Sequence, residues 1–362
     1  MNAPCLLTTG SRQTSSHRAG GSPLSLQLSE AMAALSKNHP VAAVLTGAFD
    51  RFRVRRRLPA LAADERLDGK AALVTGGASG LGFATSVDLA RRGARVLVAD
   101  CRDLERAHCR AVSLGVPPDQ IESLHLDLSD LDSIDRVVTD LARRGIYLDR
   151  LILNAAIVPT GARSTPQGLD EMFVVNYLSS FALVTRLLEE GVLPRDRRHG
   201  ELPRVVFVAS EAHRWSDDLA LDQLDWQRDG SLGRVLAWYA TYKLMLATFA
   251  WELARRLSVE GAPRVAVFAL CPGAMRTNIV RELPAALRAP LKGVMHLLFQ
   301  DPFVADEPVL YLTCSRLLEG RTAIYLHKMA PKDVDARAAD SNVGRALWER
   351  SEAVLSRARG QR

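Results

Sequence analysis

The chain has 362 residues, of which 48% are hydrophobic and 24% are charged, so it is long and apolar enough to bury a large core. Its net charge is +6, but eight basic and two acidic residues within positions 1–60 account for all of it. The excess positive charge therefore lies in the N-terminal arm, and the rest of the chain is neutral, which argues against nucleic acid as a partner. Five cysteines without paired spacing favour reduced thiols, a cytoplasmic location and no metal site.

Residues 1–66 are expected to form an N-terminal extension. Positions 1–23 are rich in Ser, Thr and Gly and are predicted to be disordered, a composition that also suits an organelle-targeting peptide. Ser29 is predicted to cap a short helix that Pro40 stops. The basic run Arg53–Arg57 is either a solvated linker or a peripheral contact with an anionic membrane, so a membrane-associated location stays open.

From Leu67 onward, short β-branched runs alternate with longer helical segments, which indicates an α/β fold with a parallel sheet. The predicted strands are Ala71–Thr75, Arg95–Ala99, Ile121–Leu126, Leu151–Asn154, Arg204–Ala209, Arg264–Leu270 and Ala323–Leu326. Seven strands with helices between them predict a Rossmann-type, doubly wound sheet in one domain over residues 67–330. Residues 331–362 are expected to add a C-terminal helical extension, with a helix from Ala338 to Arg357.

A glycine-rich turn follows the first predicted strand. Gly76, Gly80 and Gly82 stand where a sharp turn, the approach of a pyrophosphate to backbone N–H groups and the packing of a helix leave no room for a side chain. The acid Asp100 ends the second strand, 18 positions after Gly82. This context predicts a dinucleotide site, and the alternative is an ordinary surface turn.

Tyr239 and Lys243 are spaced four apart in a helical segment and should share one face. A phenol is a weak base at neutral pH, but a neighbouring ammonium favours the phenolate and should lower the pKa of Tyr239 towards the working range. The alternative is an amphipathic helix in which the tyrosine packs and the lysine extends to solvent.

With the glycine turn and Tyr239-x-x-x-Lys243 together, the chain resembles the classical short-chain dehydrogenase/reductases over residues 67–330. Ala212-His213 and the tail with Leu347-Trp348 are most similar to the retinol-dehydrogenase-like branch. The resemblance implies that Tyr239 acts as acid or base and that Lys243 lowers its pKa and holds the ribose. It also implies that Ser210, after the fifth strand, orients the substrate oxygen, and that Asn176 holds a water that relays protons.

The resemblance also implies the cofactor contacts. They are Gly76, Ser79, Gly80, Leu81, Gly82, Asp100, Arg102, Asp127, Leu128, Asn154, Tyr239, Lys243, Pro272, Gly273 and Thr277. Leu153 and Ala156 depart from the family's usual Asn-Asn-Ala-Gly turn, which leaves Asn154 as the contact there. Asp100 favours NAD because it can accept both ribose hydroxyls, and Arg102 keeps NADP open. Cys271 is interpreted as a packed thiol, since no basic partner is evident.

The regions expected to wall the substrate cleft, between Ser210 and Tyr239 and after Thr277, are rich in Leu and Trp. They favour a lipophilic alcohol, ketone or aldehyde, although each residue alone is equally well explained as core. The function predicted is hydride transfer by an NAD(P)-dependent oxidoreductase. A nucleotide sensor without turnover and a membrane-recruited scaffold are the alternatives. The resemblance implies a homodimer or homotetramer, which the long C-terminal tail could alter.

Overall fold

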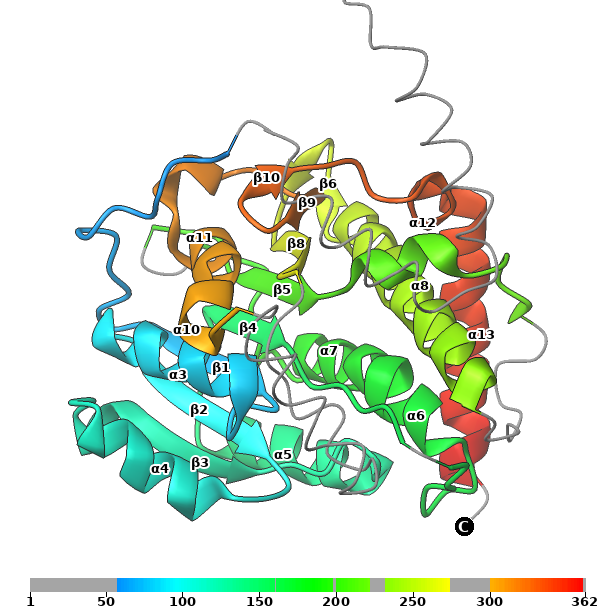
Figure 1. The fold of residues 1–362 in the computed structure, drawn as a ribbon, viewed down its shortest axis with the longest axis horizontal. Helices are drawn as coiled ribbons and strands as arrows, with labels where there is room; N and C mark the ends of the chain where they lie inside the picture. The colour runs from blue at the N-terminus through cyan, green and yellow to red at the C-terminus, as the bar shows by residue number, and fades with distance from the viewer. Residues whose placement is uncertain (1–56, 160, 198–199, 222–231, 274–299, 361–362) are drawn as a thin grey trace, which may run out of the picture.

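The computed structural model describes residues 57–159, 161–197, 200–221, 232–273 and 300–360. Eight strands form the central sheet in the order β10-β9-β8-β5-β4-β1-β2-β3 (Figure 1). Their bounds are β1 Ala71–Thr75, β2 Arg95–Asp100, β3 Ile121–His125, β4 Arg150–Leu153, β5 Arg204–Val208, β8 Ala266–Cys271, β9 Ile324–His327 and β10 Ala330–Pro331. The seven predicted strands are confirmed and pair in parallel. The prediction missed β10, a two-residue strand antiparallel to β9.

Helices cover both faces of the sheet (Figure 1). One face carries α3 Gly80–Arg91, α4 Leu104–Ser113, α10 Pro302–Ala305 and α11 Glu307–Cys314. The other carries α5 Leu131–Arg143, α7 Ser179–Glu189, α8 Leu232–Arg256 and α13 Ser341–Gly360. Shorter elements are α6 Glu171–Phe173, α12 Ala336–Ala339, the 3₁₀ turns Pro118–Gln120, Glu211–Trp215 and Arg316–Leu318, and the hairpin of β6 Ser258–Val259 and β7 Ala262–Pro263. The doubly wound α/β architecture is thereby confirmed.

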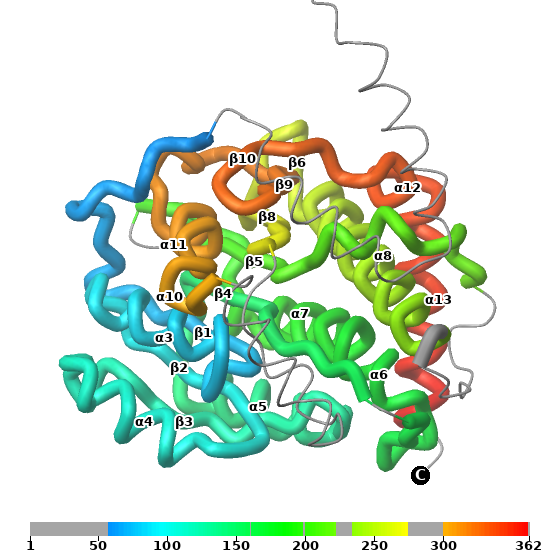
Figure 2. The backbone as a smooth tube through the Cα atoms, in the orientation of Figure 1, coloured from blue at the N-terminus to red at the C-terminus, as the bar shows by residue number. Residues whose placement is uncertain are grey.

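The strand order reverses beside β1, which pairs with β2 on one side and with β4 on the other. The tube in Figure 2 shows the chain passing from β3 through α5 back to the middle of the sheet. At such a switch point the loops after the two neighbouring strands diverge to opposite faces and leave a crevice at the carboxyl ends, where ligands of open α/β sheets bind. The glycine turn follows β1, and Asn154 follows β4.

The C-terminal segment belongs to the core. Its predicted helix is found as α12 followed by α13, and α13 buries Leu347 and Val354 in the cluster formed by α7 and α8. The Trp348 ring centroid lies 4.9 Å from that of Phe181. At the other end, the backbone N–H of Leu58 donates to the carbonyl of Met329 at 2.8 Å. The helix predicted after Ser29 and the basic residues 53–56 lie outside the described residues.

One helical stretch of the described chain, Glu171–Glu189, is long and apolar enough to cross a membrane, with a mean hydropathy of 1.2. In this fold 78% of that stretch is buried inside the protein. Its apolar character follows from its place between the sheet and α13, where most of its side chains meet other apolar groups.

Candidate active site

The glycine turn brings the start of α3 against the end of β1. Gly76 has φ +64°, and a Cβ on Gly82 would lie 2.2 Å from the carbonyl oxygen of Gly76. Both positions therefore need glycine, the first for its backbone conformation and the second for the close approach. Gly80 has φ +56° and open space where its side chain would be. Ser79 precedes α3 with an extended backbone, and Leu81 is buried.

Asn154 ties the glycine turn to β4. Its side-chain amide donates to the carbonyl oxygens of Thr75 at 2.9 Å and of Gly76 at 3.3 Å. The Thr75 hydroxyl accepts from the backbone N–H groups of Asn154 at 3.0 Å and Ala155 at 3.2 Å. Asn154 thus holds the shape of the turn. Thr75, which the sequence reasoning did not include in the site, supports it from the last residue of β1.

Two carboxylates predicted to contact the cofactor, Asp100 and Asp127, lie at or just after the ends of neighbouring strands of the sheet. Asp100 accepts hydrogen bonds from the backbone N–H of Ala78 at 3.2 Å and of Cys101 at 2.9 Å, which links the end of β2 to the glycine turn. Asp127 accepts from the backbone N–H and the hydroxyl of Ser129 at 2.9 and 2.7 Å. Leu128 is buried, whereas Arg102 is exposed beside Asp100.

The turn fits a dinucleotide. The N-terminus of the twelve-residue helix α3 and the open space at Gly80 provide room and backbone N–H groups for a pyrophosphate. Asp100 lies at the end of β2, where a carboxylate can accept hydrogen bonds from the ribose hydroxyls of a dinucleotide. Of the other predicted contacts, Pro272 is buried and Gly273 has φ +87° with the Lys328 side chain lying across it. Thr277 lies outside the described residues.

Tyr239, Lys243 and Ser210 come together at the carboxyl end of β5. Tyr239 and Lys243 lie on α8, and the Lys243 Nζ is 5.7 Å from the centroid of the Tyr239 ring. Lys243 is buried and donates to the carbonyl oxygen of Val208, the last residue of β5, at 3.0 Å. The Tyr239 and Ser210 hydroxyls are hydrogen-bonded to each other. The side chains therefore share one face, as the spacing of four predicts.

Ser210 is fixed by the 3₁₀ turn that it begins. Its hydroxyl accepts from the backbone N–H of Ala212 at 3.2 Å. The Nδ1 atom of the buried His213 lies 2.6 Å from the Ser210 carbonyl oxygen. The backbone N–H of Asp335 is 3.3 Å from Nε2 of the same ring. His213 therefore connects the serine loop to the segment before α12, a positioning contact that spans too many residues to be read from the sequence.

The expected pKa of Tyr239 is wrong in its direction. Burial raises the pKa of Tyr239 to about 12, Cys271 nearby adds to the rise, and the hydrogen bond with Ser210 lowers it. Burial also lowers the pKa of Lys243 to about 8. Burial thus disfavours both the phenolate and the ammonium that would stabilise it, and the lysine loses its charge above about pH 8. At neutral pH the phenol is protonated.

Asn176 lies in a π-helical turn, Val174–Leu178, between α6 and α7. Its buried side chain accepts from the backbone N–H of Ile157 at 2.7 Å and donates to the Ile157 carbonyl at 2.8 Å. The amide thus clamps the loop after β4 and uses both its groups to do so. The proton relay implied by the resemblance stays a prediction.

Cys271 has a basic neighbour after all. It ends β8 and pairs in register with His327, the last residue of β9, and the thiol and the imidazole are hydrogen-bonded. Cys271 is buried in the core cluster, so the interpretation of a packed thiol is confirmed, although the reason given for it, the lack of a basic neighbour, is not. The two residues are 56 positions apart in the sequence, so their contact became evident only from the parallel pairing of β8 and β9.

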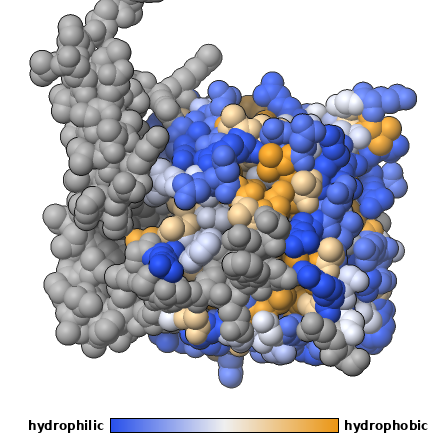
Figure 3. Space-filling model, turned by 90° about the vertical axis from the view of Figure 1, so that its right-hand side faces the viewer, coloured by the Kyte–Doolittle hydropathy of each residue, from blue (hydrophilic) through white to orange (hydrophobic). Residues whose placement is uncertain are grey.

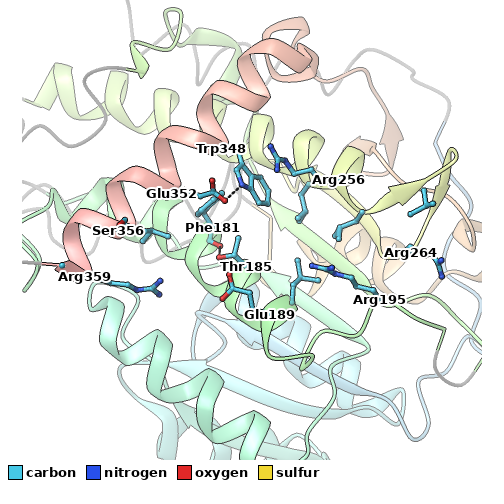
Figure 4. A pocket seen from close by; sticks show the side chains of 16 residues that line it. Phe181, Thr185, Glu189, Arg195, Arg256, Arg264, Trp348, Glu352, Ser356 and Arg359 are labelled. Atoms are coloured by element: carbon cyan, nitrogen blue, oxygen red, sulfur yellow. Dashed lines mark hydrogen bonds between the residues drawn. The ribbon is translucent and has the colours of Figure 1, made fainter.

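A separate groove of about 810 Å³ lies between α7, α8 and α13 (Figure 4). Phe181 and Trp348 belong to its lining, and Arg195, Arg256 and Arg359 extend along its rim. The Arg256 guanidinium stacks on the Trp348 ring, 4.1 Å from its centroid. None of the predicted site residues lines this groove, so it is distinct from the crevice at the ends of the strands.

Comparisons with known proteins agree with this geometry. A family model for short chain dehydrogenases matches residues 70–216. Retinol dehydrogenase 14 of Mus musculus is 33% identical over 303 residues, which cover 80% of this chain and 86% of that protein. Polyprenol dehydrogenase of Danio rerio is 29% identical, covering 85% and 92%. An uncharacterised protein from Mycobacterium paratuberculosis, whose structure is solved, has 28% identity, coverage of 80% and 95%, and a TM-score of 0.60.

The glycine turn, the Tyr239 and Lys243 pair and the doubly wound sheet are the features that these relatives would lead one to expect. The two dehydrogenases match over 303 and 312 residues, so the likeness extends well beyond residues 70–216 that the family model matches. The chain therefore belongs to the short-chain dehydrogenase/reductase family of NAD(P)-dependent oxidoreductases that act on alcohol groups.

Proposed function

We propose that the protein interconverts a lipophilic alcohol and its ketone or aldehyde, with Tyr239 as the proton donor or acceptor. The observation that carries the proposal is the meeting of the Tyr239 and Ser210 hydroxyls above the buried Lys243, at the carboxyl end of β5. Two hydroxyls at one point can both bond a single carbonyl or alkoxide oxygen, which is the atom whose charge changes during the reaction.

Each residue has a separate task in this reaction. The nicotinamide, when bound, exchanges hydride with the carbinol carbon. Tyr239, protonated at neutral pH, donates its proton to a carbonyl oxygen, and Ser210 supplies a second hydrogen bond that stabilises the developing charge. Lys243, with its pKa near 8, can return a proton to the phenolate without a large energetic penalty. Asn176 keeps the loop after β4 in place beside them.

The lipophilic nature of the substrate rests on two supports. Trp215 follows Ser210 in the 3₁₀ turn and is 47% exposed, and Leu236, on α8 before Tyr239, is 41% exposed. Figure 3 shows the side of the molecule that carries α8 and α13, on which a band of apolar side chains runs between hydrophilic ones. In addition, the relatives are named as dehydrogenases of retinol and of polyprenol, both long apolar alcohols.

We further propose NAD as the preferred cofactor. Asp100 presents a carboxylate at the end of β2 that would repel a 2′-phosphate, and the backbone contacts at Ala78 and Cys101 hold it in place. Arg102, exposed next to it, is the residue that would favour NADP instead. Peripheral membrane contact through the basic N-terminal arm, a cytoplasmic location and a homo-oligomeric state stay predictions from the sequence.

The test is a panel of alcohols and carbonyl compounds. Linear aldehydes, cyclic ketones and isoprenoid alcohols of increasing chain length are assayed with NAD(H) and NADP(H) side by side. We expect kcat/KM to rise with apolar chain length and to be higher with NAD(H). Equal rates for short polar and long apolar compounds would contradict the proposed substrate class. A higher kcat/KM with NADPH across the panel would contradict only the proposed cofactor.

A further inference from the structure

Ser210 lies just beyond the last contact that its strand makes with the sheet. Strand β5 ends at Val208, and the backbone N–H of Ala209 donates to the carbonyl of Leu270 on β8 at 2.8 Å. The sheet therefore fixes the chain up to Ala209. The place of the serine depends on the 3₁₀ turn Glu211–Trp215 that follows it.

The buried His213 contacts the carbonyl oxygen of Ser210 with two atoms. Its backbone N–H donates to that oxygen at 3.1 Å, and the Nδ1 atom of its ring lies 2.6 Å from the same oxygen. The Tyr325 ring packs edge-on against the His213 ring, with centroids 5.4 Å apart. The carbonyl belongs to the peptide that follows Ser210, so fixing it fixes the backbone frame from which the serine hydroxyl projects.

Only one form of the His213 ring satisfies both of its hydrogen bonds. The carbonyl of Ser210 can only accept, so Nδ1 must carry a proton. The backbone N–H of Asp335 can only donate, and it lies 3.3 Å from Nε2, which must therefore carry none. Both contacts thus require the neutral Nδ1–H tautomer. Burial lowers the pKa of His213 from 6.5, although the hydrogen bond to Ser210 raises it, so the ring is neutral at pH 7.

The C-terminal part of the chain holds the other side of the turn. The Arg337 side chain, in α12, donates to the carbonyls of Arg214 at 3.4 Å and Ser216 at 2.6 Å. These bonds fasten the far end of the turn. Among these contacts, the His213 ring is the one that connects the segment before α12 to the main chain of Ser210.

The geometry points to His213 as a positioning residue of the active site. In its Nδ1–H form it holds the main chain of Ser210 against the segment before α12, and with it the hydroxyl that bonds the substrate oxygen beside Tyr239. The inference rests on the proposed function, because that function gives the Ser210 hydroxyl its task. His213 itself needs no contact with substrate or cofactor and acts through the serine.

Two substitutions of His213 separate its two ring contacts. The amide nitrogen of Asn can take the place of Nδ1 and donate to the Ser210 carbonyl, whereas the amide oxygen of Gln can take the place of Nε2 and accept from Asp335. With the best compound of the substrate panel, we expect His213→Gln to lower kcat about 10–10²-fold and His213→Asn to stay within about threefold of wild type. The dissociation constant for NADH should not change in either variant. Equal kcat values for the two variants would overturn the inference.

A double-mutant cycle shows whether the effect passes through the serine. In Ser210→Ala the hydroxyl is absent, so adding His213→Gln should lower kcat by no more than about a further twofold. A further fall as large as in the protein with Ser210 would overturn the inference, because His213 would then act on another part of the site. His125→Asn, which replaces an exposed histidine at the end of β3, is the control and should match wild type.

The tautomer of His213 can be measured by NMR in the wild-type protein, without turnover. When the eight histidines carry a nitrogen isotope label, the shifts of the ring nitrogens distinguish the two neutral tautomers. We expect a ring in the Nδ1–H form at pH 7, with its signals absent from His213→Asn. If no ring has that form, the inference is wrong, whatever the folding of the variants.

If His213→Gln does not fold, Arg337→Met takes its place in the cycle. This change releases the carbonyls of Arg214 and Ser216, so we expect kcat to fall about threefold, and to fall no further in the Ser210→Ala background. Equal falls in both backgrounds would overturn the inference. Absence of turnover with every compound of the panel, together with the Nδ1–H tautomer, would contradict the proposed function. Normal turnover without that tautomer would contradict only the role given to His213.

Discussion

Positively charged side chains are buried at the amino ends of β4 and β5 and at the carboxyl end of β5, but the number of their hydrogen-bond partners differs. At the amino ends, Arg150 is 1% exposed and Arg204 is 0% exposed. Arg150 donates to the carbonyl of Thr313 at 2.7 Å and pairs with Glu201, and Arg204 donates to the carbonyls of Leu312 and Ser315 at 3.1 and 2.9 Å. These carbonyls end α11, where a cation is also favoured by the helix dipole.

At the carboxyl end, Lys243 is 2% exposed and has one hydrogen bond, to the carbonyl of Val208. No carboxylate pairs with it among the residues that the structure describes. At the amino ends the two arginines thus have several carbonyl and carboxylate partners, although Nε and Nη2 of Arg204 have no hydrogen-bond partner within the described part of the chain and burial lowers the pKa of Arg204 to about 10. The carboxyl end keeps a cation with one hydrogen bond and two hydroxyls available. The difference indicates that the fold offsets more of the cost of buried charge at the amino ends than at the carboxyl end, where binding and proton transfer are needed.

The largest effect should come from Tyr239→Phe at the carboxyl end. Removing the phenol removes the proton donor, so we expect kcat to fall about 10²–10⁴-fold. The dissociation constant for NADH, measured by fluorescence titration, should change little, since the ring remains. A nucleotide sensor without turnover would have no activity for the substitution to remove. Undiminished turnover in the variant would contradict the role given to Tyr239.

At the amino end, Arg150→Met should destabilise the protein. The change leaves the buried Thr313 carbonyl without its partner, while Glu201 keeps its ion pair with Lys70, so we expect the free energy of unfolding to fall by about 1–3 kcal/mol. Urea denaturation measures the loss. Arg163→Met is the matched control, because its ion pair with Glu171 is largely exposed and should contribute at most about 1 kcal/mol. Equal losses in the two variants would contradict the comparison.

Lys243→Met should raise the free energy of unfolding, in contrast to Arg150→Met. Burial lowers the pKa of Lys243 from 10.5 to about 8, so the folded protein bears the cost of the buried charge in full below pH 8. The variant should therefore be more stable than wild type at pH 7, by up to about 3 kcal/mol, and inactive. Between pH 8 and pH 10.5 the wild type loses this charge, and the advantage of the variant should disappear. If the variant is less stable than wild type at pH 7, the interactions of Lys243 outweigh the cost of burying its charge, and the prediction is wrong.

Gly82→Ala tests the close approach beneath the crevice. The new methyl group would lie 2.2 Å from the Gly76 carbonyl, so the turn must shift, and overpacking of this kind costs about 1–3 kcal/mol. We expect weaker NADH binding together with a lower unfolding midpoint. Gly161→Ala is the control, since nothing lies within 4 Å of the added group there. Normal NADH binding by Gly82→Ala would rule out the glycine turn as the pyrophosphate site.

The smallest effect is expected from Asp100→Ala. Without the carboxylate, the ratio of kcat/KM for NAD to that for NADP should fall about tenfold, equivalent to about 1.4 kcal/mol. Glu105→Ala removes an exposed acid from the first turn of α4 and separates this effect from that of net charge. If both variants change the ratio of kcat/KM for NAD to that for NADP equally, Asp100 does not select the cofactor through its ribose.

Local pattern was enough to predict the strands and the shared face of Tyr239 and Lys243, because both depend on neighbours in sequence. The pattern did not show that Arg150 and Arg204 are buried, since an arginine at the start of a strand ordinarily extends to solvent. Their partners, the last carbonyls of α11, come over 100 positions later. Separation in sequence also hid His327 from Cys271, 56 positions earlier, and His213 from the segment before α12, more than 100 positions later.

The pKa of Tyr239 was mispredicted for a related reason. Spacing on a helix places a lysine near the phenol but does not tell how deeply the two are buried, and burial acts on both groups in the direction that opposes charge. The π turn at Asn176 could not be predicted either, because helix propensity does not distinguish a π turn from an α-helix.

The place of β1 in the sheet bears on how the protein folds. Strands β1, β2 and β3 follow one another along the chain and can pair through short connections, whereas the pairing of β1 with β4 and the hydrogen bond between Tyr177 and Ser351, 174 positions apart, close long loops. The dinucleotide crevice straddles that seam. A chain in which only the first three strands have assembled has one wall of the crevice, so tight nucleotide binding should emerge late in refolding, after the two halves have joined.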